Sequence, residues 1–358
     1  MVPNFRTDSL NRRNFLGVAA AAGAMVASSR VIGPAQAHHD HAVPAGHPVS
    51  STHSTITLGD VTVTRVIEFY GTIGLGPTAL LPDSPMSLWQ QNKSWLDPHF
   101  WLPSQGLLPL AVQTWVLRSE GRTILVDTGV GNGKYRPNSP IWSYLNTDYL
   151  GSLARAGVHP EDVDIVVNTH IHADHVGWNT RLEGRKWVPT FPNAKYLVSK
   201  ADFTYWNPEG PYHPRLAHDI QNTYEDSIAP VHDAGQIQLW EGSHTIDRNL
   251  RLQLTPGHTP GSSTLWLESK SDRALFVGDC LHSPVQIIRP EYNSCFEEDE
   301  KAARKTRAKV LGWAADHNAL VFPQHMGGHG AAEVMRKGSD FTIKDWAGFF
   351  VPTKVEVA

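Results

Sequence analysis

The chain has 358 residues, of which 41% are hydrophobic and 18% charged, a globular composition long enough for one large domain or two small ones. The formal net charge of −4 gives no basis for nucleic-acid binding, and no segment expected in the mature chain is long and apolar enough to cross a membrane. The two cysteines, Cys280 and Cys295, could form one disulfide, but Cys280 stands beside a candidate metal ligand, so we expect two free or buried thiols.

Residues 1–37 are predicted to be a targeting signal and not part of the fold. Arg12 and Arg13 precede a small-residue apolar run at 17–27, and Ala-Gln-Ala at 35–37 has the form of a signal-peptidase site. The segment resembles a twin-arginine export signal, which implies a periplasmic or secreted protein. The alternative, an N-terminal helix of the domain, is disfavoured because the apolar run is rich in Ala and has no polar face.

The mature chain is predicted to consist of a short leader and a single domain. Residues 38–55 are rich in His, Pro, Ala and Ser and have no apolar periodicity, which predicts a flexible leader. Its histidines could instead bind or load metal loosely. Residues 56–358 are expected to form one domain.

The domain is expected to open with two hairpins. Residues 56–70 alternate around a turn at Gly59-Asp60, and residues 110–126 form two β-branched runs around a turn at 119–122. The stretch between them, residues 71–106, contains several Pro and Trp residues and is too irregular for a core element. It is expected to be either a lid or pocket wall, or a loop that its own aromatic residues pin to the surface.

The rest of the domain alternates strands and helices. Strands are predicted at 163–167, 194–198, 250–254, 263–267, 274–277 and 319–322, the last being the final strand, and helices at 149–156, 200–206 and 297–317. The remainder of the aromatic-rich stretch 176–232, outside 194–198 and 200–206, is expected to contribute to a substrate pocket. No nucleotide-binding Gly-rich loop follows any of these strands.

Metal-ligand residues are concentrated in the loop after strand 163–167. His170, His172, Asp174 and His175 place three imidazoles and one carboxylate within six residues. Imidazole nitrogens and carboxylate oxygens are the usual ligands of Zn²⁺, and alternate positions can face one ion while the next two reach a second. A solvated polar loop is the alternative, but it would not explain further ligand-type residues after later strands.

Those further residues are His258, Asp279 and His325, each near the end of a predicted strand. His329 is a rival of His325, which we prefer because it directly follows its strand, whereas His329 lies beyond two glycines. Asp127, also at a strand end, fits a carboxylate that orients a ligand histidine through its second ring nitrogen, or a turn-forming Asp. The remaining histidines of this region are expected in the pocket or on the surface: His213, His218 and His232.

The order of these motifs resembles the five motifs of the metallo-β-lactamase superfamily, over about residues 56–330. The resemblance implies an α/β fold, an αββα sandwich of two mostly antiparallel or mixed sheets with helices outside, and a two-metal site at one edge. By the same resemblance, His170, His172 and His258 would hold one metal ion, and Asp174, His175 and His325 the other. Asp279 would bridge both, and Asp127 would orient a ligand. Zn²⁺ is the expected ion, with Co²⁺, Mn²⁺ and Fe²⁺ as alternatives.

The segment around Asp279 resembles particular enzyme classes within the superfamily. β-Lactamases typically carry Cys or Ser there, so Asp favours lactonases, thioesterases and phosphotriesterases of the superfamily. The run from Gly278 to Gln286 resembles methyl parathion hydrolase-type enzymes and quorum-quenching lactonases. The best-known acyl-homoserine lactonases have Tyr at the place of His282, which is expected either to donate to a developing oxyanion or to tie down its loop by a hydrogen bond to the backbone.

The expected function is hydrolysis of a lactone or carboxylic ester that has an apolar or aromatic part. A metal-bound hydroxide would attack, because such ions lower the pKa of water to about 7, and Asp174 would orient it or accept a proton. The alternatives are a phosphotriesterase of methyl parathion hydrolase type, an iron persulfide dioxygenase with one metal, and a non-catalytic exported metal-binding protein. Neither a nucleic acid nor, after signal removal, a membrane is an expected partner, and a homodimer remains open.

Overall fold

A computed structural model of the chain describes residues 55–137, 139–210, 222–351 and 356–357, which fall within one compact unit, 51–358. The predicted targeting signal, nearly all of the leader, His213 and His218 lie outside the described residues, so those predictions stay predictions. Among the described residues, no helix has the length and apolar character needed to cross a membrane.

The first sheet holds both predicted hairpins. Its strand order is β1-β2-β3-β4-β5-β8-β9, with β17 pairing β2. The first four strands are antiparallel neighbours, while β4, β5, β8 and β9 run parallel. The strands are β1 (Thr55–Leu58), β2 (Val61–Thr72), β3 (Pro109–Ser119), β4 (Arg122–Val126), β5 (Ile165–Val167), β8 (Lys195–Ser199), β9 (Ile237–Trp240) and β17 (Glu356–Val357).

The second sheet has the order β10-β11-β12-β13-β14-β15-β16, with β13 and β14 parallel and the other neighbours antiparallel. The prediction that strand 319–322 is the last was wrong, because β15 and β16 extend the sheet beyond it. The strands are β10 (Ser243–Thr245), β11 (Leu250–Leu254), β12 (Ser263–Ser269), β13 (Asp272–Gly278), β14 (Leu320–Pro323), β15 (Ala332–Lys337) and β16 (Asp340–Trp346). A separate hairpin, also not predicted, pairs β6 (Thr180–Glu183) with β7 (Lys186–Pro189).

Three predicted helices are present, with ends within three residues of the prediction: α5 (Tyr149–Arg155), α7 (Lys200–Trp206) and α11 (Glu300–Asp316). Asp299 caps α11 by accepting a hydrogen bond from the Ala302 N–H at 2.9 Å. The shorter elements are α2 (Pro77–Leu80), α3 (Met86–Gln91), α4 (Lys93–Leu96), α6 (Ala173–Val176), α9 (Ala229–Asp233), α10 (Val285–Ile288), the 3₁₀ turns η1 (Pro140–Trp142), η2 (Pro160–Asp162) and η3 (Gly177–Asn179), and the π-helical turn η4 (Tyr224–Ile228).

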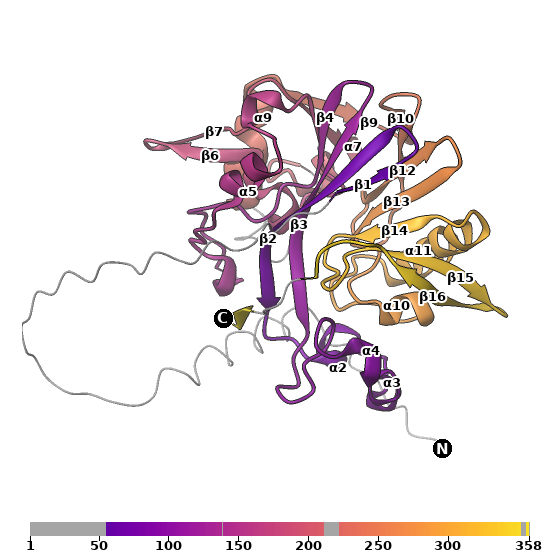
Figure 1. Cartoon of the computed structure of the whole chain (residues 1–358). Helices are drawn as coiled ribbons and strands as arrows, with labels where there is room; N and C mark the ends of the chain where they lie inside the picture. The colour runs from indigo at the N-terminus through magenta and orange to yellow at the C-terminus, as the bar shows by residue number, and fades with distance from the viewer. Residues whose placement is uncertain (1–54, 138, 211–221, 352–355, 358) are drawn as a thin grey trace, which may run out of the picture. The chain divides into compact units, whose positions relative to one another are not determined.

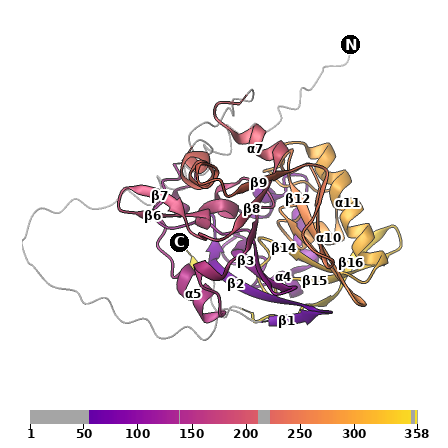
Figure 2. The same cartoon turned by 90° about the horizontal axis from the view of Figure 1, so that it is seen from above.

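The two sheets pack face to face because successive residues of a strand point to opposite sides. On β3, Trp115 joins the core between the sheets, where its ring lies 5.0 Å from Phe322 of β14 and 6.2 Å from Phe276 of β13, centroid to centroid. Val116 points the other way and packs with Tyr149 of α5. Figures 1 and 2 show α5 and α9 outside the first sheet and α10 and α11 outside the second. The predicted αββα sandwich is confirmed.

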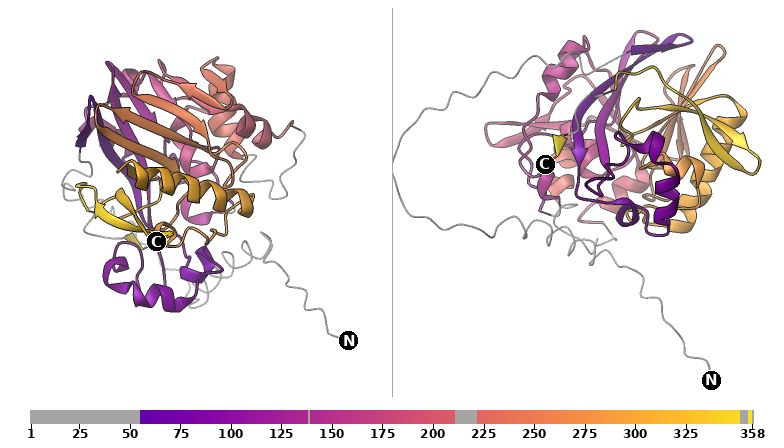
Figure 3. Two further views of the ribbon diagram at one scale, coloured as in Figure 1. Left: turned by 90° about the vertical axis from the view of Figure 1, so that its right-hand side faces the viewer. Right: turned by 60° about the horizontal axis from the view of Figure 1, so that its bottom comes forward.

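The irregular aromatic stretch 71–106 forms α2, α3 and α4, beside the C-terminal strands in both views of Figure 3. Its aromatic residues point inward: Trp89 and Trp101 are buried and meet edge to face at 6.3 Å, and Phe100 stacks on Trp346 of β16 at 5.1 Å. The segment is therefore held by its own aromatic residues, as one of the two alternatives expected, but it forms three short helices and not an irregular loop, and Trp89 and Trp101 are core residues.

Candidate metal centre

The predicted ligands lie in loops that follow four strands at one edge of the sandwich. β5 leads to the loop 170–175 in the first sheet, while in the second sheet β11, β13 and β14 lead to His258, Asp279 and His325. β13 and β14 are parallel, and β11 runs the same way because both β11 and β13 are antiparallel to β12. The carboxyl ends of these strands therefore present their loops together.

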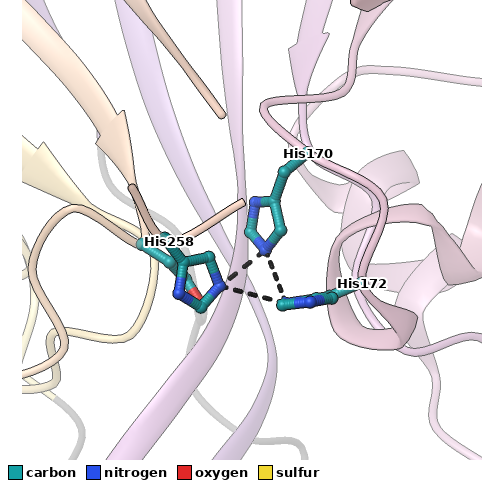
Figure 4. A group of neighbouring side chains, drawn as sticks. His170, His172 and His258 are labelled. Atoms are coloured by element: carbon teal, nitrogen blue, oxygen red, sulfur yellow. Dashed lines mark hydrogen bonds and ion pairs between the residues drawn. The ribbon is translucent and has the colours of Figure 1, made fainter. Parts of the chain in front are cut away.

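His170, His172 and His258 form the first group (Figure 4). The Nδ1 of His172 lies 3.0 Å from the Nε2 of His170 and 3.0 Å from the Nε2 of His258. His170 and His258 are buried and His172 is half-buried. One nitrogen of each ring is thus directed at a common point, as neutral imidazoles are when they share an ion.

Asp174, His175 and His325 form the second group. The Nε2 of His325 lies 3.3 Å from the Nε2 of His175 and 3.3 Å from the Oδ2 of Asp174, and all three residues are buried. The Nε2 of His175 is 3.8 Å from the same Asp174 oxygen.

Asp279 lies between the two groups, and the Nε2 of His325 is near both of its carboxylate oxygens, 3.1 Å from Oδ1 and 3.2 Å from Oδ2. Its Oδ2 is 3.4 Å from the Nε2 of His258 and 3.9 Å from that of His170. Its Oδ1 is 3.1 Å from the Nε2 of His325 and 3.3 Å from that of His175. A carboxylate in this position can serve two ions at once.

Three of these rings are oriented through the nitrogen that faces away from the centre. His175 Nδ1 lies 2.8 Å from Asp127 Oδ2, His170 Nδ1 lies 3.1 Å from the Thr169 hydroxyl, and His325 Nδ1 lies 2.9 Å from the Ala111 carbonyl oxygen. Asp127 also accepts hydrogen bonds from the backbone N–H and hydroxyl of Thr169, both at 2.8 Å. Such contacts fix the tautomer and aim Nε2 at the centre.

The electrostatics of the centre are those of crowded, buried groups. Burial, together with the neighbouring imidazoles, holds the pKa of His170 well below its ordinary value. Burial would raise the pKa of Asp279, but His175, His325 and His282 outweigh it and hold that pKa well below its usual range. Burial would lower the pKa of His175, yet Asp279, Asp127 and Asp174 raise it well above normal.

A divalent cation fits this donor set. Within each group the ligand atoms lie within 4.8 Å of one another and are all imidazole nitrogens or carboxylate oxygens, the ligands of Zn²⁺-type ions. His325 faces a carbonyl oxygen through Nδ1, so its ring, when neutral, has its lone pair at Nε2, toward Asp279. The Oδ1 of Asp279 is buried and has no hydrogen bond among the described residues. A cation between these atoms would satisfy them.

His282 is buried beside the centre, with its Nε2 3.2 Å from the Oδ2 of Asp279. Neither ring nitrogen makes a hydrogen bond within the described part of the chain, and burial lowers the pKa of the ring. The loop is held instead by Gln286, whose Oε1 accepts the backbone N–H of His282 at 2.7 Å. The alternative role for His282, as a loop tether, is therefore wrong.

The other candidate residues lie apart from both groups. The Nδ1 of His329 is 3.1 Å from the Phe349 carbonyl oxygen, and His232 is on the surface beside Asp233. Cys280 and Cys295 are free thiols.

The aromatic residues of 176–232 do not all line a pocket as expected. Trp178 stacks on Tyr149 at 5.1 Å and, with Phe191, belongs to the core outside the first sheet. Trp206 is the exception near the centre, because its ring lies 5.4 Å from that of His172.

Asp202 of α7 holds two ligand loops together and was not found from the sequence. Its Oδ2 accepts hydrogen bonds from the backbone N–H of Ile171 at 2.9 Å and the Thr259 hydroxyl at 3.0 Å, and its Oδ1 accepts the N–H of Gly261 at 2.6 Å. In the sequence, Ser199 followed three residues later by Asp202 indicates only an ordinary helix start.

Comparison with known proteins agrees with this geometry. Residues 107–325, more than half of the chain, match the sequence model of the Metallo-beta-lactamase superfamily. The chain belongs to this superfamily. Among curated relatives, an N-acyl homoserine lactonase from Bacillus sp is 26% identical over 189 residues, which are 49% of this chain and 66% of the relative, just under two thirds of its length.

Solved structures of the superfamily share the fold. The crystal structure of hydrolase AbOPH has a TM-score of 0.68 and 23% identity, covering 82% of this chain and 97% of its own. AidC, a dizinc quorum-quenching lactonase in complex with a hexanoyl homoserine product, has a TM-score of 0.66 and 21% identity over the same shares of the two chains. At these identities the likeness extends to the fold alone.

Proposed function

We propose that this superfamily member is a hydrolase with two divalent metal ions, most favourably Zn²⁺, that opens a lactone or cleaves a carboxylic ester. The observation that carries the proposal is the position of Asp279 between two groups of candidate ligands, with its carboxylate within 3.4 Å of a ring nitrogen of each. The name of the curated lactonase relative favours a lactone among the substrates of this superfamily.

In this proposal His170, His172 and His258 would hold one ion, and Asp174, His175 and His325 would hold the other. Asp279, whose carboxylate is near both groups, would be a ligand shared by the two sites. Bound ions of this kind supply Lewis acidity and lower the pKa of water to about 7.

The chain's own residues orient the ligands and surround the reacting group. Asp127 keeps His175 in one tautomer, and Asp202 keeps the loops of His170 and His258 at a fixed separation. Asp174, a member of the second group, would orient the attacking water or accept a proton. His282 has ring nitrogens that make no hydrogen bond among the described residues, so it can donate one to an oxygen that gains charge.

The test is a hydrolysis screen of full-length protein that has been stripped of metal and reloaded with Zn²⁺, Co²⁺ or Mn²⁺. Acyl-homoserine lactones, other lactones, aryl esters, thioesters, phosphotriesters and β-lactams are compared by kcat/KM. We expect lactones or carboxylic esters to be the best class, and His282→Phe to lower kcat by about 100-fold with a smaller change in KM.

Other outcomes would select an alternative or reject the proposal. Phosphotriesters as the best class would favour the phosphotriesterase, and a single tightly held iron would favour the dioxygenase. No turnover of any class after reloading with each ion would contradict a hydrolase.

A further inference from the structure

Glu297 and Arg307 form a buried ion pair behind the first ligand group, where no sequence motif predicted one. The Oε1 of Glu297 accepts a hydrogen bond from the Nη2 of Arg307 at 2.7 Å, and both side chains have at most 1% of their surface exposed. Together with His258 and Cys280, both residues line one small cavity. Removing two charges from water costs desolvation free energy, so a buried ion pair requires a structural or functional reason.

The second oxygen of Glu297 points at His258. Its Oε2 lies 3.4 Å from the Nδ1 of His258, and neither atom has a hydrogen bond within the described residues. Two buried, unsatisfied polar atoms of complementary type thus face each other. In contrast, His170, His175 and His325 each have a hydrogen-bond partner for the nitrogen that faces away from the centre.

Backbone contacts already hold the loop that carries His258, but none of them holds its ring. The N–H of Asp299 donates to the Gly257 carbonyl at 2.9 Å, and the N–H of Glu298 donates to the His258 carbonyl at 3.1 Å. The Thr306 hydroxyl donates to the Pro256 carbonyl at 2.7 Å. On the side of the imidazole that faces away from the centre, the Nδ1 of His258 faces Glu297.

Arg307 links the same carboxylate to the loop of Asp279. Its Nε donates to the Cys280 carbonyl oxygen at 2.8 Å, and its Nη1 donates to the carbonyl oxygens of Pro290 and Tyr292, both at 2.8 Å. One guanidinium therefore fixes Glu297 relative to the residue that follows Asp279.

We infer that Glu297 is the positioning residue of His258: its carboxylate accepts a hydrogen bond from Nδ1, so that Nε2 faces the first ion. Arg307 holds this carboxylate in a fixed position relative to the loop of Asp279. This inference rests on the proposed two-metal centre. A carboxylate in this position raises the basicity of the ligand as well as fixing its orientation.

The test compares Glu297→Gln with Glu300→Gln in full-length protein. Gln keeps the volume of Glu297 but has one acceptor oxygen, which cannot serve both Arg307 and His258. Glu300 is exposed in the first turn of α11, so its variant makes the same chemical change away from the centre. Metal affinity is measured by competition with a chelator, and the absorption spectrum of the Co²⁺-loaded protein reports ligand geometry.

We expect Glu297→Gln to weaken one of the two ions by about 10- to 100-fold and to change the Co²⁺ spectrum, while the second ion and the Glu300→Gln variant behave as wild type. Glu297→Asp keeps the charge beside Arg307 but shortens the side chain by one methylene. The Asp variant is expected to show the same weakening. If the Gln variant does not fold, the Asp variant tests whether Glu297 positions His258.

Two results would overturn the inference in distinguishable ways. Wild-type protein that binds two ions, with a folded Glu297 variant that binds both equally tightly and has the same Co²⁺ spectrum, would refute the role of Glu297 alone. Wild-type protein that binds no divalent ion would contradict the proposed centre itself.

Discussion

At the scale of single residues, the proposed centre depends on how its candidate ligands would be divided between two ions. Asp279 has carboxylate oxygens within 4 Å of ring nitrogens of both groups. His258 belongs to the first group and His325 to the second. The three residues should therefore differ in what their loss does to metal content.

We expect His258→Ala and His325→Ala each to lower metal content from two ions per chain to about one, and Asp279→Ala to weaken both sites, because the Asp279 carboxylate contacts both groups. Elemental analysis after dialysis against limited Zn²⁺ measures the stoichiometry. His232→Ala, at an exposed histidine outside both groups, is the control and should keep the wild-type content. Equal loss in all three ligand variants would show that the division is wrong.

The ligand residues could be predicted from the sequence because each is a His or Asp near the end of an apolar strand. The residues that support them could not. Glu297 and Asp202 contact loops from distant parts of the chain, at His258 and Ile171, and nothing local distinguishes them from ordinary acidic residues near a helix start. His282 was found only through the motif that contains Asp279, and its lack of a tether became visible only in the structure.

At the scale of elements, α11 packs directly against the loop that carries His258. Gly257 has φ +148°, and a Cβ on it would lie 2.4 Å from backbone atoms of Ala303. We expect Gly257→Ala to lower the free energy of unfolding by about 2–3 kcal/mol, from backbone strain and steric conflict together. Urea unfolding of the metal-free protein measures the loss.

Two other glycines separate the causes of that loss. Gly242 has φ +64° but open space around it, so Gly242→Ala should cost only about 1 kcal/mol from strain. Gly348 has neither a positive φ nor a near neighbour, and Gly348→Ala should be close to neutral. Similar losses at Gly257 and Gly242 would mean that the contact with α11 contributes little.

The segment between β4 and α5 is joined to η4 by a buried cluster with a surplus positive charge. Arg136 binds both carboxylate oxygens of Asp226, at 2.6 and 2.9 Å, and Lys134 lies 3.2 Å from the same carboxylate and 3.9 Å from the Trp187 ring centroid. Burial, with Arg136 nearby, lowers the pKa of Lys134 to about 7 even though Asp226 opposes the change. The folded state thus loses this proton at a lower pH than the unfolded chain.

Because the unfolded chain keeps that proton up to about pH 10.5, stability should rise with pH between about 7 and 10.5. We expect the free energy of unfolding of wild type, relative to Lys134→Met, to increase by up to about 1.4 kcal/mol per pH unit in this window. Urea unfolding at pH 7.5, 8.25 and 9 measures it. The free energy of unfolding of Lys186→Met, at an exposed lysine of β7, should change with pH as that of wild type does. A difference between wild type and Lys134→Met that does not change with pH would contradict the surplus charge.

The sequence predicted elements well where apolar residues alternate and less well elsewhere. β11 and α7 have the predicted ends, because their apolar patterns are bounded by turn or capping residues. β15 and β16 were missed because they are edge and near-edge strands whose exposed, charged positions hide the alternation. The helices of 71–106 were missed because each is only four to six residues long.

At the scale of the whole molecule, the centre joins the two sheets. His170, His172, Asp174 and His175 follow β5 of the first sheet, whereas the other three ligands follow strands of the second. Imidazoles from the loops of both sheets lie close together with nitrogens facing each other. Ions at this edge would therefore bind the native sandwich and not the unfolded chain.

We expect chelation to destabilise the whole sandwich. Ions held at 100 to 1,000 times their dissociation constant stabilise the native state by about 3–4 kcal/mol per site, so EDTA treatment should lower Tm by several degrees and Zn²⁺ should restore it. Differential scanning calorimetry at fixed protein concentration measures both steps. Asp279→Ala, which should hold the ions weakly, is expected to show a much smaller shift on chelation. A Tm that EDTA leaves unchanged in metal-loaded wild type, with the metal shown to be removed, would mean that the ions do not connect the two sheets.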